Sequence, residues 1–167
     1  MEVAGSIPAG AIGPESHARE ASSTARALPF PSGCWGIHGS VVTISTNSEQ
    51  ALLKAVFNNT SYVVSSVYVQ LHTANPGAAG TTSVASNNTR KAVTFAAASG
   101  SNPASVVSNA DAAWTSVPTA ETYTHISLWD ASTSGNHLWY GALSASVTVG
   151  VGDNFTIASG SLTVTLT

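Results

Sequence analysis

The stretch that decides the fold is VYVQLHTANPG, residues 67–77. Its first six residues place Val67, Val69 and Leu71 on alternate positions. Successive side chains of a strand point to opposite faces of a sheet, so this alternation predicts a β-strand with one apolar face. The Asn-Pro-Gly that follows is typical of a turn, because proline fixes φ and glycine accepts positive φ. The stretch therefore predicts a strand that ends in a tight turn.

The same period of two recurs to the end of the chain. Further alternating runs occupy residues 92–97, 125–129, 137–142, 147–149, 155–157 and 162–166. Turn signals rich in Gly, Asn or Pro separate these runs, and no helical pattern lies between them. Short alternating strands joined by turns indicate an all-β protein. We expect an antiparallel β-sandwich, jelly-roll-like, with about seven or eight strands.

One short helix, over about residues 46–57, is expected before the first long strand. Thr46 and Glu49 have the spacing of a capping box, in which a hydroxyl and a carboxylate satisfy free N–H groups. The apolar stripe of the helix comes from pairs four residues apart, Leu52 with Val56 and Leu53 with Phe57. Asn58 and Asn59 then suit the left-handed conformation that ends many helices.

Residues 1–40 differ in character from the rest. They contain four of the seven prolines and no sustained apolar period. We expect either an irregular N-terminal arm that wraps a neighbouring subunit or a non-native upstream extension, with a natural start near Val41. Residues 41–167 are expected to form a single domain. If the arm is native, its candidate anchors are the apolar residues Leu28, Phe30, Trp35 and Ile37.

Charge is scarce in this chain. Charged residues make up 8% of it and the net charge is −3. A surface with so few charges gives a free monomer little solubility. The composition therefore favours a protein whose surface is covered in an assembly. Only five Lys and Arg are present, too few to neutralise a nucleic-acid backbone. No apolar run approaches the roughly 18 residues of a membrane span, so neither nucleic acid nor a membrane is an expected partner.

Several blocks of the sequence resemble a set of small tailed-phage proteins that are usually described as tail fibre, minor tail or other virion proteins. Residues 67–77 are similar to their strand and Leu-His-Thr-Ala-Asp-Pro-Gly turn, with Asn75 in place of Asp. Residues 88–95 resemble a Tyr-Ala-Arg-Gln-Ala-Val-Thr-Phe strand, with Thr89 as the departure, and residues 123–130 resemble Val-Thr-His-Val-Gly-Leu-Trp-Asp. The likeness spans about residues 42–167 and excludes residues 1–40.

The resemblance implies a structural protein of the virion, made in the cytoplasm of the bacterial host. It implies a chain that assembles with itself, as a homotrimer, and docks on other virion proteins at the tail tip or fibre. A head decoration protein is the alternative, because small trimeric sandwiches also serve that role. The resemblance carries no catalytic residues, and the sequence leaves the choice between tail and head open.

Aromatic and histidine side chains outside the apolar stripes are the candidate contact residues. Trp129 and Trp139 fall at such positions, next to Tyr140, His125 and His137. One interpretation is that the indoles fill the second face of the sheet beneath a loop. The other is that these five residues form a protein interface or a platform on which host-surface glycans stack, since aromatic residues are enriched at such sites.

A metal or catalytic centre is not expected. His72, His125 and His137 lie on three predicted strands near Asp130, but they lack the short spacing of typical metal ligands. The chain has no Gly-x-Ser-x-Gly motif, and its acidic residues lie beside turns, where they usually cap backbone groups. We therefore expect no enzyme activity, no metal and no cofactor.

Overall fold

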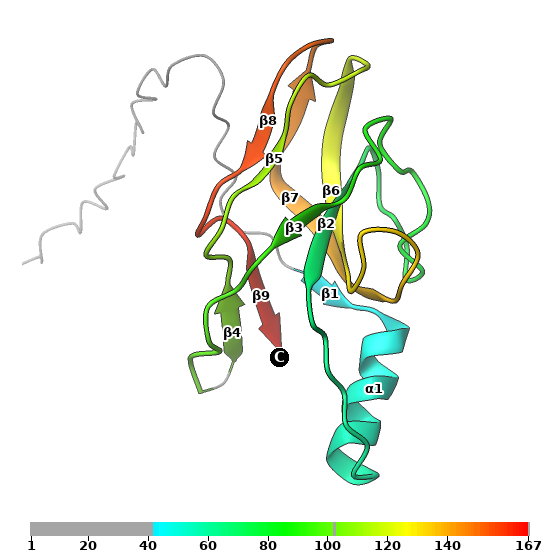
Figure 1. Cartoon of the computed structure of the whole chain (residues 1–167), viewed down its shortest axis with the longest axis vertical. Helices are drawn as coiled ribbons and strands as arrows, with labels where there is room; N and C mark the ends of the chain where they lie inside the picture. The colour runs from blue at the N-terminus through cyan, green and yellow to red at the C-terminus, as the bar shows by residue number, and fades with distance from the viewer. Residues whose placement is uncertain (1–41, 102, 167) are drawn as a thin grey trace, which may run out of the picture.

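The structure is a computed structural model that describes residues 42–101 and 103–166 (Figure 1). The expected arm, residues 1–40, lies outside the described residues. The same holds for its candidate anchors Leu28, Phe30, Trp35 and Ile37.

Five antiparallel strands form the main sheet, in the order β1-β7-β6-β2-β3. They are β1 (Val42–Ile44), β2 (Val67–His72), β3 (Lys91–Val93), β6 (Glu121–Trp129) and β7 (His137–Val149). The first alternating run of the sequence, residues 67–72, forms β2, which pairs with both β6 and β3. The long strands β6 and β7 form the centre of the sheet, and β1 and β3 form its edges.

Two short antiparallel pairs lie against the main sheet (Figure 1). One pair is β4 (Ala104–Val107) with β9 (Thr163–Leu166), and the other is β5 (Ala112–Trp114) with β8 (Phe155–Ile157). This arrangement confirms a mostly antiparallel, sandwich-like β fold with one helix. The described residues contain nine strands where about seven or eight were expected. Six of the nine have only three or four residues, too short for period-two alternation to resolve.

The core lies between the two layers. Tyr123 of β6 packs on Phe155 of β8 with ring centroids 5.1 Å apart, and Trp114 of β5 lies 5.7 Å from the same ring. Leu71 and Ile126, which pair across β2 and β6, are fully buried beneath them. Tilted aromatic contacts of this kind combine large apolar burial with favourable ring geometry. The aromatic residues therefore connect the short strands to the main sheet.

A β-bulge between β6 and β7 determines on which face of the sheet Trp139 and Tyr140 lie. Leu128 pairs with Trp139, but Trp129 pairs with His137, so Leu138 has no partner of its own. The extra residue lets the neighbours Leu138 and Trp139 both pack against the apolar core. The prediction that Trp139 points away from the apolar stripe is therefore wrong. Tyr140 lies beside Ser127 on the opposite face.

Helix α1 (Thr46–Phe57) has the bounds that the sequence predicts. Its N-cap is Ser45, not Thr46: Ser45 is extended, at φ −79° and ψ 156°, and its Oγ accepts a hydrogen bond from the Ser48 N–H at 3.2 Å. Ser45 takes this role because its N–H also donates to Leu138 O at 2.9 Å, which fixes the chain at the end of β1. Asn59 has the expected left-handed conformation, with φ 51°.

The helix projects beyond the end of the main sheet (Figure 1). After it, the chain runs back beside α1 to enter β2. No helix within the described residues is long and apolar enough to cross a membrane.

Candidate functional site

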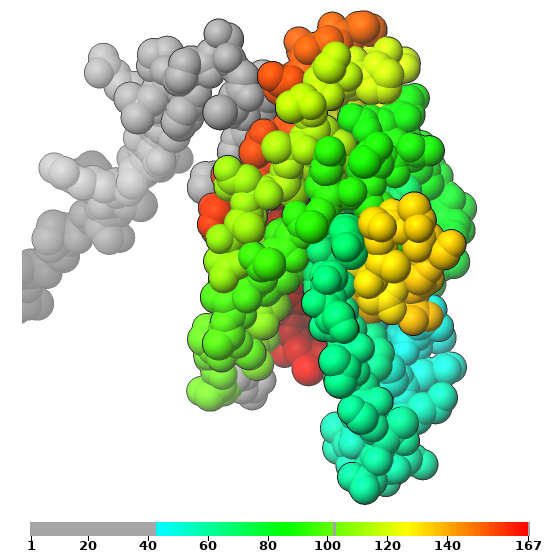
Figure 2. Space-filling view, in the orientation of Figure 1, coloured from blue at the N-terminus to red at the C-terminus, as the bar shows by residue number. Residues whose placement is uncertain are grey.

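The second face of the main sheet, opposite the core, collects most of the candidate residues. Pairing across β2, β6 and β7 aligns Gln70 with Ser127 and Tyr140, and Trp129 with His137. The loop of residues 73–90 and the hairpin loop of residues 130–136 lie together beside this part of the sheet, green and yellow-orange in Figure 2. We call this surface the covered face and define it as Gln70, His72, Ser127, Trp129, His137 and Tyr140.

A chain of hydrogen bonds crosses the covered face. The Trp129 indole N–H donates to Ser127 Oγ at 2.7 Å, and Ser127 Oγ lies 2.7 Å from His72 Nε2. The other ring nitrogen, His72 Nδ1, lies 2.9 Å from Thr82 O, which can only accept. A neutral imidazole with its proton on Nδ1 therefore satisfies every group in the chain. Burial lowers the pKa of His72 below its usual 6.5, which favours this neutral form.

His137 is held between two carbonyl oxygens. Its Nδ1 lies 2.9 Å from Ala78 O and its Nε2 lies 3.0 Å from Trp139 O. Burial lowers the pKa of His137, and the charge of Arg90 lowers it further, against the two carbonyl contacts. Gly80 packs on the ring so closely that a Cβ at this position would lie 2.6 Å from His137 Cδ2. His137 thus fixes the middle of the 73–90 loop to β7.

Arg90 connects the sheet with the hairpin loop. Its Nε donates to Gln70 Oε1 at 3.1 Å, and its Nη1 donates to Ala131 O at 3.0 Å and to Ser134 O at 2.6 Å. The guanidinium carbon lies 3.6 Å from the centroid of the Trp129 ring, in the geometry of a cation–π contact. One cation therefore covers the indole and ties two loops to the sheet.

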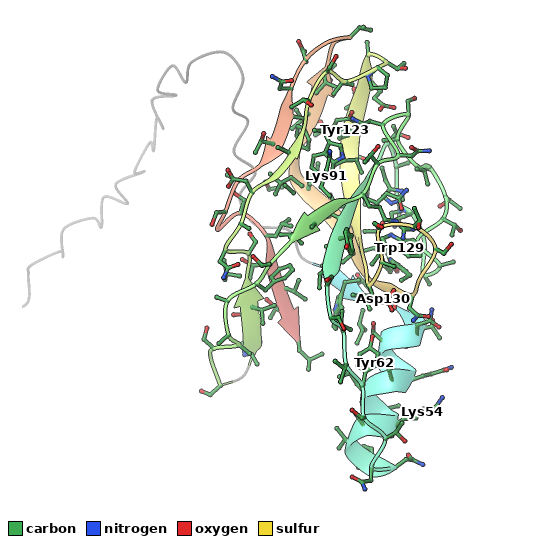
Figure 3. The ribbon with its side chains drawn as sticks, in the orientation of Figure 1. Lys54, Tyr62, Lys91, Tyr123, Trp129 and Asp130 are labelled. Carbon is green, nitrogen blue, oxygen red and sulfur yellow. The ribbon has the colours of Figure 1, made fainter. Side chains whose placement is uncertain are left out.

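The hairpin loop is also closed from within. Asp130 accepts hydrogen bonds from the Asn136 backbone N–H at 2.7 Å and from its side-chain amide at 2.8 Å. Gly135 has φ +77°, and a Cβ there would clash with Asp130 Oδ1. The turn therefore needs glycine for both its conformation and its space. Figure 3 shows Trp129 and Asp130 next to each other at the base of this loop.

The five candidate contact residues do not form one surface. Trp129 is 6% exposed and His137 is 2% exposed, both on the covered face. Tyr140 and His125 are half-buried on the same side of the sheet, whereas Trp139 packs toward the core. A single stacking platform cannot use Trp129 and Trp139 together, because they lie on opposite faces. For Trp129, the structure agrees with the interpretation that it fills the second face beneath a loop.

Sequence reasoning missed three residues of this region: Arg90, Ser127 and Gly80. The alternating pattern by itself assigns no role to any of them. The available signal was that a chain with five Lys and Arg places one of them immediately before a strand. An arginine there can reach neighbouring carbonyls with its fork of donors.

Ser127 and His72 have the hydroxyl–imidazole separation that nucleophilic catalysis uses. Both residues are fully buried, however, and Ser127 Oγ also receives the Trp129 N–H. The pair is therefore a closed structural contact with no approach for a substrate. Among residues 42–101 and 103–166, no group of three or more His, Cys, Asp or Glu is placed to hold a metal ion.

A shallow groove lies at a different place, between α1 and the segment that follows it. Its volume is about 230 Å³. It is lined by Asn47, Gln50, Ala51, Lys54, Thr60, Ser61, Tyr62 and Asn136, which are mostly amide and hydroxyl side chains. The Tyr62 hydroxyl is buried and has no hydrogen-bond partner within the described part of the chain. In Figure 3, Tyr62 lies on the segment beside the helix and Lys54 lies on α1.

Fold and site together define a β-sandwich-like protein whose second sheet face is closed by loops. The family model described as podophage GP4 fiber I protein gp80 matches residues 43–165. The chain therefore belongs to this family of podophage fibre proteins. No curated protein matches the chain. Membership supports a structural role in the fibre of a tailed phage, in association with other virion proteins.

Proposed function

We propose that this protein is a homotrimeric structural component of the phage tail fibre, placed at the tail tip and docked on other virion proteins. The observation that carries the proposal is the family match over residues 43–165, which covers nearly all of the described domain. The closed covered face agrees with it. Arg90, His72 and His137 hold the loops to the sheet through contacts with loop carbonyl groups. Loops held in this way suit a fibre subunit, because such a subunit must transmit force without rearranging.

Copy number in the particle tests the location. Quantitative mass spectrometry of purified virions, combined with immunogold electron microscopy, counts the copies and places them. A small number of copies at the tail supports the fibre role. Hundreds of copies spread over the head would overturn it in favour of a capsid decoration protein.

Host-surface glycans are the second candidate, as ligands of the same fibre. The groove beside α1 favours them, because its amide and hydroxyl groups suit the polar edges of a sugar and Tyr62 adds an aromatic ring. Asn47→Ala removes one groove amide at an exposed position. Glycan-array binding that Asn47→Ala abolishes supports the groove, whereas binding lost only in Trp139→Ala or Tyr140→Ala moves the site to β7. Absence of binding by the wild-type protein removes this candidate.

A further inference from the structure

Helix α1 has two faces of different character. Ser48, Ala51, Leu52 and Ala55 are buried or half-buried, so this side of the helix packs on its own domain. The opposite side is exposed throughout and carries Glu49, Gln50, Leu53, Lys54, Val56 and Phe57. We call these six residues the outer face of α1.

Three large apolar side chains of the outer face are mostly in water. Leu53 is 58% exposed, Val56 is 71% exposed and Phe57 is 78% exposed. They follow one another within five positions of a helix that projects from the sheet. Exposed apolar side chains are common singly, but a contiguous group marks a contact surface. A partner is therefore expected to cover the outer face.

The spacing of the outer face fits another helix of the same kind. Gln50, Leu53 and Phe57 are separated by three and then four residues, the a-d-a spacing of a heptad seam. In this register the residues packed on the domain occupy the b, c and f positions, which a helix pair leaves on its outside. Gln50 and Lys54 also line the shallow groove beside α1, but both remain exposed, so the positions that suit a partner helix are open to solvent.

The charges on the outer face identify the partner. In the same register Glu49 is at g and Lys54 is at the next e, five residues later. The g position of one helix faces the following e position of its neighbour in a parallel pair, so Glu49 of one copy would face Lys54 of another. An antiparallel pair would instead place Glu49 against Glu49 and Lys54 against Lys54. Opposite charges on a single sequence therefore favour a second copy in parallel orientation.

We propose that copies of this chain associate in parallel through the outer face of α1, with Leu53 and Phe57 in the seam and Glu49–Lys54 pairs between copies. The inference rests on the proposed homo-oligomeric role and names its interface. The helix has 12 residues, fewer than two heptads, so the strength of the contact depends on few side chains. Substitutions at those side chains should therefore have large effects.

Light scattering on the full chain tests the seam. The single cysteine of the chain is replaced (Cys34→Ser), so that no disulfide through it can link two copies. Leu53→Ser with Phe57→Ser should weaken self-association at least about tenfold, because central aromatic and aliphatic contacts dominate such interfaces. Val151→Ser is the control, since the exposed fraction of Val151, 71%, lies between those of Leu53 and Phe57, but Val151 lies in the turn between β7 and β8. Circular dichroism checks that each variant is folded. Undiminished association in the double variant, or a wild-type chain that stays monomeric at high micromolar concentration, would overturn the inference.

Charge exchange and cross-linking test the orientation. Glu49→Lys and Lys54→Glu should each weaken association about two- to fivefold by placing like charges together, and the two changes combined in one chain should restore it. Gln50→Cys, in the Cys34→Ser background, should form a disulfide between copies if the helices are parallel. Failure of both rescue and cross-linking would refute the parallel arrangement. The count of copies in the virion is independent of these results, so the fibre role can stand even if this interface fails.

Discussion

Replacing Arg90 by alanine should destabilise the domain substantially. The guanidinium donates to three oxygen atoms and lies over the Trp129 ring. Hydrogen bonds from a charged group contribute about 1.5–3 kcal/mol each, and a desolvated cation–π contact contributes up to about 2 kcal/mol. The sum is an upper limit, because such contributions are not additive within one network.

The burial of each partner of Arg90 determines how much of this summed stabilisation is lost in the alanine variant. Gln70 is only 7% exposed, so its amide oxygen loses a partner that water cannot easily replace. Ala131 is half-buried and Ser134 is exposed, so their carbonyl oxygens can turn to water. We therefore expect a loss of about 2–4 kcal/mol from the free energy of unfolding. For a domain of this size that corresponds to a fall in Tm of roughly 6–20 °C.

Thermal unfolding followed by circular dichroism, supported by urea titration, measures this loss. Arg90→Lys should lie between wild type and Arg90→Ala, because lysine retains the charge but not the planar fork. Lys91→Gln is the control: it removes the neighbouring cation, which has no side-chain hydrogen bond within the described residues, and should change stability by less than about 0.5 kcal/mol. If Arg90→Ala unfolds within about 2 °C of the Lys91→Gln control, the contacts of Arg90 do not stabilise the fold.

Two further predictions concern the covered face. Gly80→Ala should cost roughly 1–3 kcal/mol more than Gly152→Ala in urea unfolding. Both glycines have positive φ, but only the Gly80 Cβ would meet the His137 ring, so equal costs would contradict that close contact. The free energy of unfolding should also fall as the pH drops from about 7.5 to about 5.5. The pKa values of His72 and His137 are lowered in the fold, so the unfolded chain takes up protons first as the pH passes below 6.5. Stability that is constant or higher at the lower pH would show that these imidazoles are not held neutral.

Sequence patterns were sufficient for the elements that depend on near neighbours. The alternation in residues 67–72 predicted β2, and the helical pattern of residues 46–57 with its end signals predicted the bounds of α1. Local steric rules set the period of a strand or helix, so these features can be read without knowing the fold. The block-by-block resemblance pointed to phage virion proteins, and the family match places the chain among podophage fibre proteins.

The cap of α1 shows where local reasoning became ambiguous. Ser45 and Thr46 can both cap a helix, and the sequence favoured Thr46 because of Glu49. Strand β7 determines which residue is the cap, because the Leu138 carbonyl accepts a hydrogen bond from the Ser45 N–H and thereby holds Ser45 in the extended conformation. The partner strand lies more than ninety residues away in sequence.

Tertiary structure alone decided which aromatic residues are buried and what covers them. The bulge opposite Leu128 turns Trp139 toward the core and Tyr140 away from it, an outcome that depends on the register between β6 and β7. Arg90 reaches Ala131 and Ser134, which are 41 and 44 residues away, and in doing so closes the face on which Trp129 lies. The physical reason is that register and loop closure are set by pairs of segments that meet only after folding. A periodic pattern within one segment cannot contain that information.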